Sequence, residues 1–149
     1  MAVEITRLGA GTKYPTAALR KIAETLLRAV MQSRAELSIA LVGDREMRPL
    51  NAKYRKKTQT TDVLSFFVED QPLSGAKILG DVAISVEQAR RQAKERGKTL
   101  KSEMVTLLIH GILHLLGYDH EISPRQAQIM FLYERKLYAH LCDRGLLKV

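Results

Sequence analysis

Three of the chain's four histidines lie in one short segment, HGILHLLGYDH at residues 110–120. Residues four apart on an α-helix differ by about 40° in azimuth and about 6 Å in height, so His110 and His114 would project from one face. Gly117 can take the left-handed conformation that ends a helix, and the resulting turn would bring His120 back toward the other two. The spacing therefore predicts that His110, His114 and His120 bind one transition-metal ion.

The predicted ligand set is typical of a catalytic metal. Three neutral imidazoles leave one position of a tetrahedral zinc ion open, whereas a structural zinc normally has a fourth protein ligand. An open zinc site lowers the pKa of bound water to about 7 and polarises phosphoryl or carbonyl oxygens. We therefore expect one Zn²⁺ per chain, although such sites also accept nickel, copper or iron. Asp62 or Asp81 would close the open position if either reached it, and Asp119 would orient an imidazole or cap its own turn.

The same histidine spacing occurs in the metzincin proteases, whose motif is H-E-x-x-H-x-x-G-x-x-H. In that motif the glutamate after the first histidine is the general base, but Gly111 occupies this position here. Because glycine has no side chain that accepts a proton, a metallopeptidase remains only an alternative prediction. Glycine inside a helix costs about 1 kcal/mol relative to alanine, so Gly111 indicates a close approach by a ligand or by backbone.

The elements that must position these residues alternate along the chain. Apolar–polar alternation and β-branched runs predict strands, and helical periodicity with capping residues predicts helices. Four strands interleaved with about five helices predict an α/β fold, a single domain over residues 1–149 whose helices cover a small mixed four-stranded sheet. The predicted strands are 3–6, 37–43, 62–68 and 78–85, and the predicted helices are about 15–30, 44–54, 86–96, 102–116 and 124–141. Asp44, Ser85 and Ser123 are the predicted N-caps, and Gly80 predicts a bulge or a close backbone approach.

Composition and charge favour a folded protein with a polyanionic partner. The chain has 149 residues, 46% hydrophobic and 27% charged, which is ordinary for a globular protein. Its net charge of +8 favours nucleic acid, since basic side chains that neutralise phosphates release counterions, but charge alone is equally compatible with solubility. The single cysteine, Cys142, excludes an intrachain disulfide. Without a signal peptide or a membrane-spanning run, a cytoplasmic protein is expected.

Three segments resemble one known family, in the family's order. HGILHLLGYDH, LNAKYRKKTQTTDVLSFF and LGDVAIS are similar to motifs of the YbeY-type metallo-endoribonucleases, the bacterial ribosomal RNA maturation factors. The likeness spans about residues 37–134. It departs at Thr58, Thr60 and Phe67, where the family usually has Asp, Pro and Pro.

The resemblance implies a cytoplasmic enzyme that cuts single-stranded RNA with one zinc ion, in processing of the 3′ end of small-subunit rRNA and in ribosome quality control. By this resemblance His110, His114 and His120 are the zinc ligands, Arg55 is a functionally important arginine, and residues 61–66 form a strand that lines the cleft. The implied partners are single-stranded RNA, rRNA and the ribosome or its proteins. No DNA or membrane partner is predicted.

Two basic segments are candidate phosphate contacts. Arg55 follows Lys53 in a basic run, where a guanidinium can hold a phosphate through two hydrogen bonds and stabilise the charge that develops in phosphoryl transfer. The run also suits a solvated helix and loop, and the resemblance favours the catalytic role. The run from Arg90 to Lys101 is predicted to be a solvated helix face, with RNA contact secondary. The second alternative function is a noncatalytic RNA- or ribosome-binding module whose metal only stabilises the fold.

Overall fold

Strands and helices alternate through the part of the chain that the structure describes. The computed structural model describes residues 3–55, 62–66, 68 and 77–148, with only the backbone described at 53–55. Four strands and five helices occur within these ranges, as predicted. In chain order they are β1 (Val3–Leu8), α1 (Thr16–Ala29), β2 (Ala35–Val42), α2 (Asp44–Arg55), β3 (Val63–Phe66), β4 (Lys77–Ser85), α3 (Val86–Arg96), α4 (Leu100–Leu115) and α5 (Pro124–Asp143).

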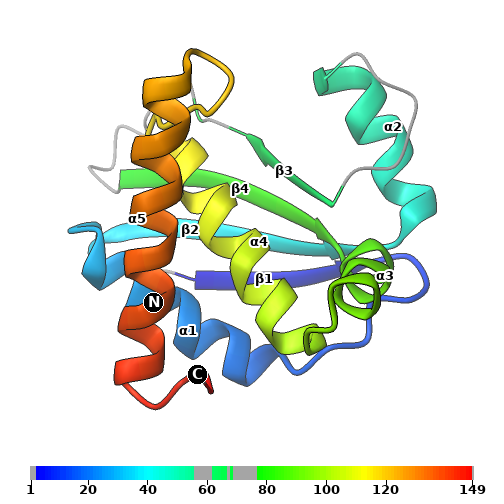
Figure 1. Cartoon of the computed structure of the whole chain (residues 1–149). Coiled ribbons are helices and arrows are strands. Elements are labelled where there is room, and N and C mark those ends of the chain that lie inside the picture. Colours follow the sequence, from blue (N-terminus) through cyan, green and yellow to red (C-terminus); the bar gives the residue numbers. More distant parts are fainter. Residues whose placement is uncertain (1–2, 56–61, 67, 69–76, 149) are drawn as a thin grey trace.

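The four strands form one mixed sheet in the order β1-β2-β4-β3 (Figure 1). β2 pairs in parallel with both β1 and β4, so that Ile39 lies between Ile5 and Val82. β3 runs antiparallel to β4 at the edge, with Val63 opposite Ile84. Parallel neighbours need crossover connections, and α1 supplies the one between β1 and β2. The predicted α/β class and mixed four-stranded sheet are confirmed.

The two faces of the sheet bury different sets of apolar side chains. On one face, Ile39 and Ile84 belong to a large core that also contains Leu26 of α1, Leu108 of α4 and Leu141 of α5. Figure 1 shows α4 and α5 crossing in front of this face. A second, smaller cluster joins the other face of the sheet to α2; its members are Val42, Met47, Leu64 and Ala83. Alternation of side chains along each strand therefore separates the two layers of helices.

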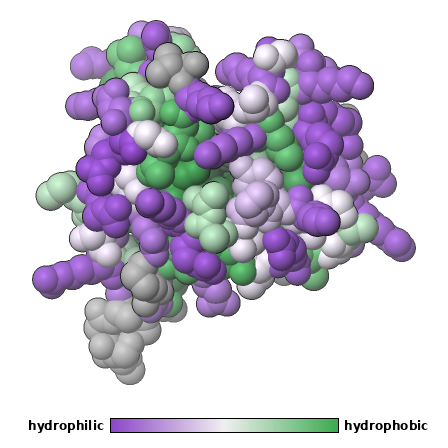
Figure 2. Space-filling model, turned by 90° about the horizontal axis from the view of Figure 1, so that it is seen from below, coloured by the Kyte–Doolittle hydropathy of each residue, from purple (hydrophilic) through white to green (hydrophobic). Residues whose placement is uncertain are grey.

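The face of the molecule seen from below is mainly hydrophilic. Polar and charged residues cover most of this face, and apolar side chains show between them (Figure 2). Within the described ranges, no helix combines the length and the apolar character that crossing a lipid bilayer requires.

A β-bulge in β4 shapes the edge of the sheet near β3. The pairing with β2 shifts by one residue, since Glu36 lies opposite Ile78 whereas Leu37 lies opposite Gly80. Gly80 has a φ of 142°, and a Cβ there would collide with the carbonyl oxygen of Phe66. The sequence predicted a bulge or a close backbone approach at this glycine, and both are present.

Two of the three predicted N-caps are present. Ser85 and Ser123 cap α3 and α5, where their side chains accept hydrogen bonds from backbone N–H groups three residues later. The prediction that Asp44 is an N-cap is wrong: it is the first residue of α2, and its carboxylate contacts Ser85 Oγ at 2.9 Å and Arg91 at 2.7 Å. Helix α4 starts earlier than predicted because Thr99 caps it.

Candidate metal centre

The last turns of α4 and the turn that follows carry the three histidines. His114 lies one turn after His110, and α4 ends at Leu115. Gly117 has a φ of 98°, and it donates its N–H to the carbonyl oxygen of His114 at 3.0 Å. Tyr118 donates its N–H to the carbonyl oxygen of Leu113 at 3.1 Å. These two bonds form a Schellman motif, so the predicted glycine-terminated helix is present and turns the chain back toward the cluster.

The turn is also held against α5 by two tyrosines. The rings of Tyr118 and Tyr133 meet edge to face, with their centroids 5.4 Å apart. Burial raises the pKa of the Tyr133 phenol above its ordinary value, and Tyr118 raises it further. The Tyr133 phenol therefore stays neutral at physiological pH, and the ring contact acts as apolar packing that fixes the approach of the turn to α5.

The three imidazoles converge. Their ring centroids lie 4.6 Å apart for His110 and His114, 5.2 Å for His110 and His120, and 5.6 Å for His114 and His120. One ring nitrogen from each lies within 4.8 Å of the others, and the Nε2 atoms of His110 and His114 are 3.1 Å apart. His110 and His114 are half-buried, and His120 is exposed. The structure therefore brings together the three side chains that the sequence predicted would converge.

The donor set fits a zinc-like cation. A tetrahedral zinc ion with Zn–N bonds of about 2.0–2.1 Å holds its ligand nitrogens roughly 3.3 Å apart, close to the observed separation of 3.1 Å. Two imidazole nitrogens at this distance cannot both carry a proton, so either one donates a hydrogen bond to the other or both direct lone pairs at a shared cation. The cluster can therefore hold a metal ion, and the donor types do not select zinc over nickel, copper or iron.

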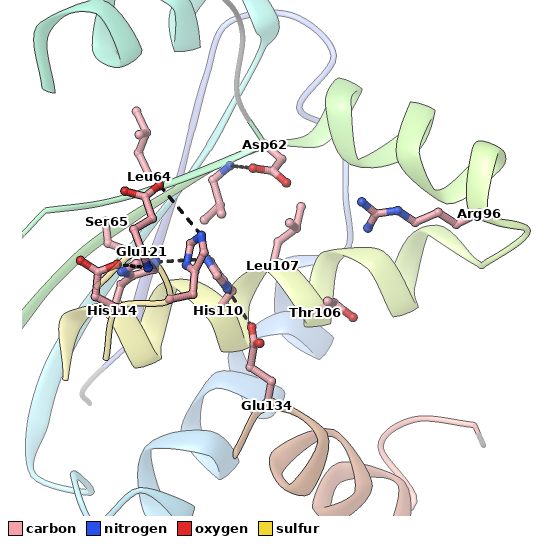
Figure 3. Close-up of a pocket in the computed structure, with 13 residues that line it drawn as sticks. Asp62, Leu64, Ser65, Arg96, Thr106, Leu107, His110, His114, Glu121 and Glu134 are labelled. Carbon is pink, nitrogen blue, oxygen red and sulfur yellow. Dashed lines mark hydrogen bonds and ion pairs between the residues drawn. The ribbon is translucent and has the colours of Figure 1, made fainter. Parts of the chain in front are cut away.

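Glu134 of α5 orients one of the three rings. Its Oε2 lies 2.7 Å from Nδ1 of His110, as drawn in Figure 3. When Nδ1–H donates this bond, Nε2 keeps its lone pair for the cluster, and the carboxylate makes the imidazole a better ligand. The sequence analysis missed Glu134. A signal was present, because Glu134 lies at helical spacing between the buried residues Met130, Leu137 and Leu141.

The aspartates considered from the sequence do not join the cluster. Oδ1 of Asp119 accepts the N–H of Glu121 at 2.8 Å, so Asp119 caps its own turn. Asp62 lies at the same cleft, but its carboxylate accepts hydrogen bonds from the Val63 backbone and from the side chain of Gln92. Asp81 is exposed on β4. Among the described residues, the cluster contains the three histidines and no fourth ligand.

A cleft of about 370 Å³ connects the cluster to β3 and to the end of α3 (Figure 3). The segment from Asp62 to Ser65 lines it, which agrees with the cleft-lining strand implied by the resemblance. Four carboxylates also line it; they belong to Asp62, Asp119, Glu121 and Glu134. The cleft is therefore an open, largely acidic groove with the imidazoles in its wall.

Gly111 lets α4 lie close to the sheet. A Cβ at this position would lie 2.7 Å from Cγ1 of Val82 and 3.3 Å from Oγ of Ser65. Ser65 also donates its hydroxyl to the carbonyl oxygen of Gly111 at 2.9 Å. The close approach expected at Gly111 is present, and its nearest atoms belong to side chains of β3 and β4, where the sequence analysis expected a ligand or backbone. Position 111 therefore faces the sheet.

Arg55 is the last residue of α2, which ends before the cleft-lining strand. The structure does not describe the side chain of Arg55. It also does not describe residues 56–61, which include Thr58 and Thr60, or Phe67. The role of Arg55 stays a prediction.

Replacing Glu134 by glutamine should weaken zinc binding by about 10-fold, within the 10- to 100-fold range typical of such outer hydrogen-bond partners. Glutamine can still accept the Nδ1–H bond of His110, but it lacks the negative charge that strengthens the imidazole as a ligand. Competition with a chromophoric chelator measures the affinity directly. Glu95→Gln, which removes an exposed carboxylate from α3, is the control. Equal zinc affinities for the two variants would contradict the role assigned to Glu134.

Comparisons with known proteins agree on one family. The family model described as "Endoribonuclease YbeY" matches residues 6–142. A relative named Endoribonuclease YbeY from Persephonella marina is 40% identical over 124 residues, which cover 83% of this chain and 81% of that protein. A relative of the same name from Myxococcus xanthus is 53% identical over 116 residues, but these cover 76% of this chain and only 38% of that longer protein. The solution structure of TM1509 from Thermotoga maritima matches with a TM-score of 0.66 and 26% identity, covering 96% of this chain and 91% of that one.

Proposed function

Because this chain belongs to the YbeY endoribonuclease family, we propose that it is a zinc-dependent endoribonuclease that cuts single-stranded RNA. The observation that carries the proposal is the cluster of His110, His114 and His120 at the wall of an open cleft, with no fourth ligand among the described residues. We further propose that the substrate is rRNA, at the 3′ end of the small-subunit rRNA, and that the enzyme serves ribosome quality control. The proposed setting is the cytoplasm, with the ribosome or its proteins as partners.

The proposed reaction divides the work among a few side chains. The three histidines would hold the zinc ion, which supplies positive charge that polarises a phosphoryl oxygen. Glu134 keeps the His110 ring in the orientation that presents Nε2 to the cluster. Arg55 would hold a phosphate through paired hydrogen bonds and stabilise the charge that develops on it. Either water or the neighbouring 2′-hydroxyl is then the attacking group.

Neither alternative function gains support from the site. A metallopeptidase of the metzincin type needs a glutamate at position 111, and this position faces Val82 in the sheet. A noncatalytic module with a structural metal would need a fourth protein ligand, and Asp62 and Asp81 are both outside the cluster.

A substrate panel tests the proposal. Zinc-loaded protein is incubated with end-labelled single-stranded RNA, double-stranded RNA and casein, each with and without a chelator. We expect cleavage of single-stranded RNA alone, lost on chelation and restored by zinc. Cleavage of casein would favour the peptidase, and failure to cut any RNA would favour the noncatalytic module.

Arg55→Ala should lower the rate of RNA cleavage by about 100-fold, because removing one preorganised donor to a developing oxyanion costs about that much or more. Zinc content should not change, since a guanidinium has no lone pair to offer a metal ion. Arg55→Lys should recover only part of the rate, because lysine keeps the charge without the paired geometry. Arg34→Ala, which removes an exposed arginine from the turn before β2, is the matched control and should cut at the parental rate.

A further inference from the structure

Arg96, at the end of α3, lines the same cleft as the histidines (Figure 3). Its side chain is 53% exposed, so the guanidinium reaches solvent. Among the described residues that line this cleft, Arg96 is the one lysine or arginine. The sequence predicted a solvated basic face for the run from Arg90 to Lys101, and Arg96 is the member of that run that reaches the site.

Arg96 is held in place by a buried carboxylate. Its Nη1 donates to Oε2 of Glu103 at 2.8 Å, and the Glu103 side chain is 0% exposed. The other oxygen of Glu103, Oε1, has no hydrogen-bond partner among the described residues. Burying an unpaired carboxylate is costly, so Glu103 favours the conformation in which Arg96 stays bound to it. The guanidinium is therefore fixed through Nη1, and it has further N–H donors on Nε and Nη2.

The position of Arg96 suits a phosphate that is separate from the one at the imidazoles. Glu103 precedes His110 by seven residues on α4, so the two lie on nearly the same side of the helix, about 10.5 Å apart along its axis. This separation is about three times the 3.4 Å rise of one nucleotide along a duplex strand, so the two positions can serve different phosphates. A cleft lined by four carboxylates needs fixed positive charge to hold a polyanion over this length.

We propose that Arg96 binds a backbone phosphate of the RNA strand, a few nucleotides from the bond that is cut, and that Glu103 positions Arg96 for this contact. This inference rests on the proposed RNA substrate. It adds a second phosphate subsite to the cleft. The contact is independent of base identity, because a guanidinium bound to a phosphate reads charge and geometry alone.

The test measures RNA binding as a function of salt. Zinc-loaded protein is titrated into a fluorescein-labelled single-stranded 2′-O-methyl RNA, and a gel confirms that the probe stays intact. Arg96→Gln should raise the dissociation constant about 10-fold at low salt and reduce the slope of log affinity against log salt by about 0.7, the value for one lost phosphate contact on a single strand. Arg90→Gln removes the same charge from an exposed position on α3 and should leave the slope unchanged.

Two further variants separate RNA binding from folding. Arg96→Gln leaves Glu103 buried without its cation, whereas the double variant R96Q/E103Q removes both charges. We expect the double variant to regain thermal stability and to keep the reduced slope. Glu103→Gln alone should weaken RNA binding less than Arg96→Gln, since the guanidinium remains but is held less firmly.

The outcomes separate the two proposals. If the parent protein binds RNA and Arg96→Gln behaves like Arg90→Gln, the subsite is wrong and the proposed function stands. If the double variant recovers both stability and the parental slope, Arg96 is structural and the subsite is equally wrong. If the parent does not bind RNA, the proposed function fails and the subsite fails with it.

Discussion

His114→Ala should give a folded protein that neither retains zinc nor cuts RNA. The Nε2 atom of His114 lies 3.1 Å from that of His110, so the substitution removes one of the two nitrogens that lie nearest each other in the cluster. Two remaining imidazoles cannot supply three ligands. Loss of an outer hydrogen-bond partner such as Glu134 typically lowers metal affinity about 10- to 100-fold, and loss of the ligand His114 should lower zinc affinity further. Alanine is a good helix former, so α4 should persist. Metal analysis after gel filtration, circular dichroism and cleavage of single-stranded RNA test the three parts of this expectation.

His140→Ala is the matched control for this experiment. His140 is half-buried on α5 and lies outside the cluster, so the same chemical change should leave zinc content and cleavage at the parental level. Cleavage by His114→Ala at the parental rate would indicate a contaminating nuclease. Stoichiometric zinc in that variant would show that the ion is bound elsewhere.

Local patterns in the sequence were enough to predict the elements and the histidine cluster. Helical spacing placed His110 and His114 on one face, and Gly117 has the positive φ that ends α4. Ser85 and Ser123 cap helices as predicted, because capping depends on residues three apart. In each case the interacting groups are neighbours in the chain, so the sequence alone carries the information.

Contacts between distant segments account for what the sequence did not predict. Glu134 reaches His110 across the α4–α5 interface, and the strand order depends on β2 pairing with β4, which lies far along the chain. Asp44 pairs with Ser85 and Arg91, two residues far along the chain, and this pairing replaces the expected N-cap role. Such contacts are set by tertiary packing, which local propensity does not encode.

Gly111→Glu, which restores the complete metzincin motif, should destabilise the protein severely and should not create a peptidase. The new Cβ would lie 2.7 Å from Cγ1 of Val82, in a buried position where α4 meets the sheet. Overpacking costs about 1–3 kcal/mol and burial of an unpaired carboxylate adds more, while the better helix propensity of a residue other than glycine returns less than about 1 kcal/mol. A net loss of about 4 kcal/mol would lower the melting temperature by roughly 10 °C in a chain of this size.

A smaller substitution separates the steric effect of the new Cβ from the effect of the buried charge. Gly111→Ala introduces the same Cβ without a carboxylate, so it should destabilise less. Val82→Ala removes the colliding methyl groups but empties a buried position, so the double variant should lose less stability than the sum of the two single losses. A coupling of this sign in the double-mutant cycle would locate the strain at the contact between α4 and β4. If Gly111→Glu had the stability of the parent and cleaved casein, the packing explanation for Gly111 would be wrong. Since the same glycine both admits β4 and stands where the protease motif has glutamate, close packing against the sheet and the absence of that glutamate have one physical cause.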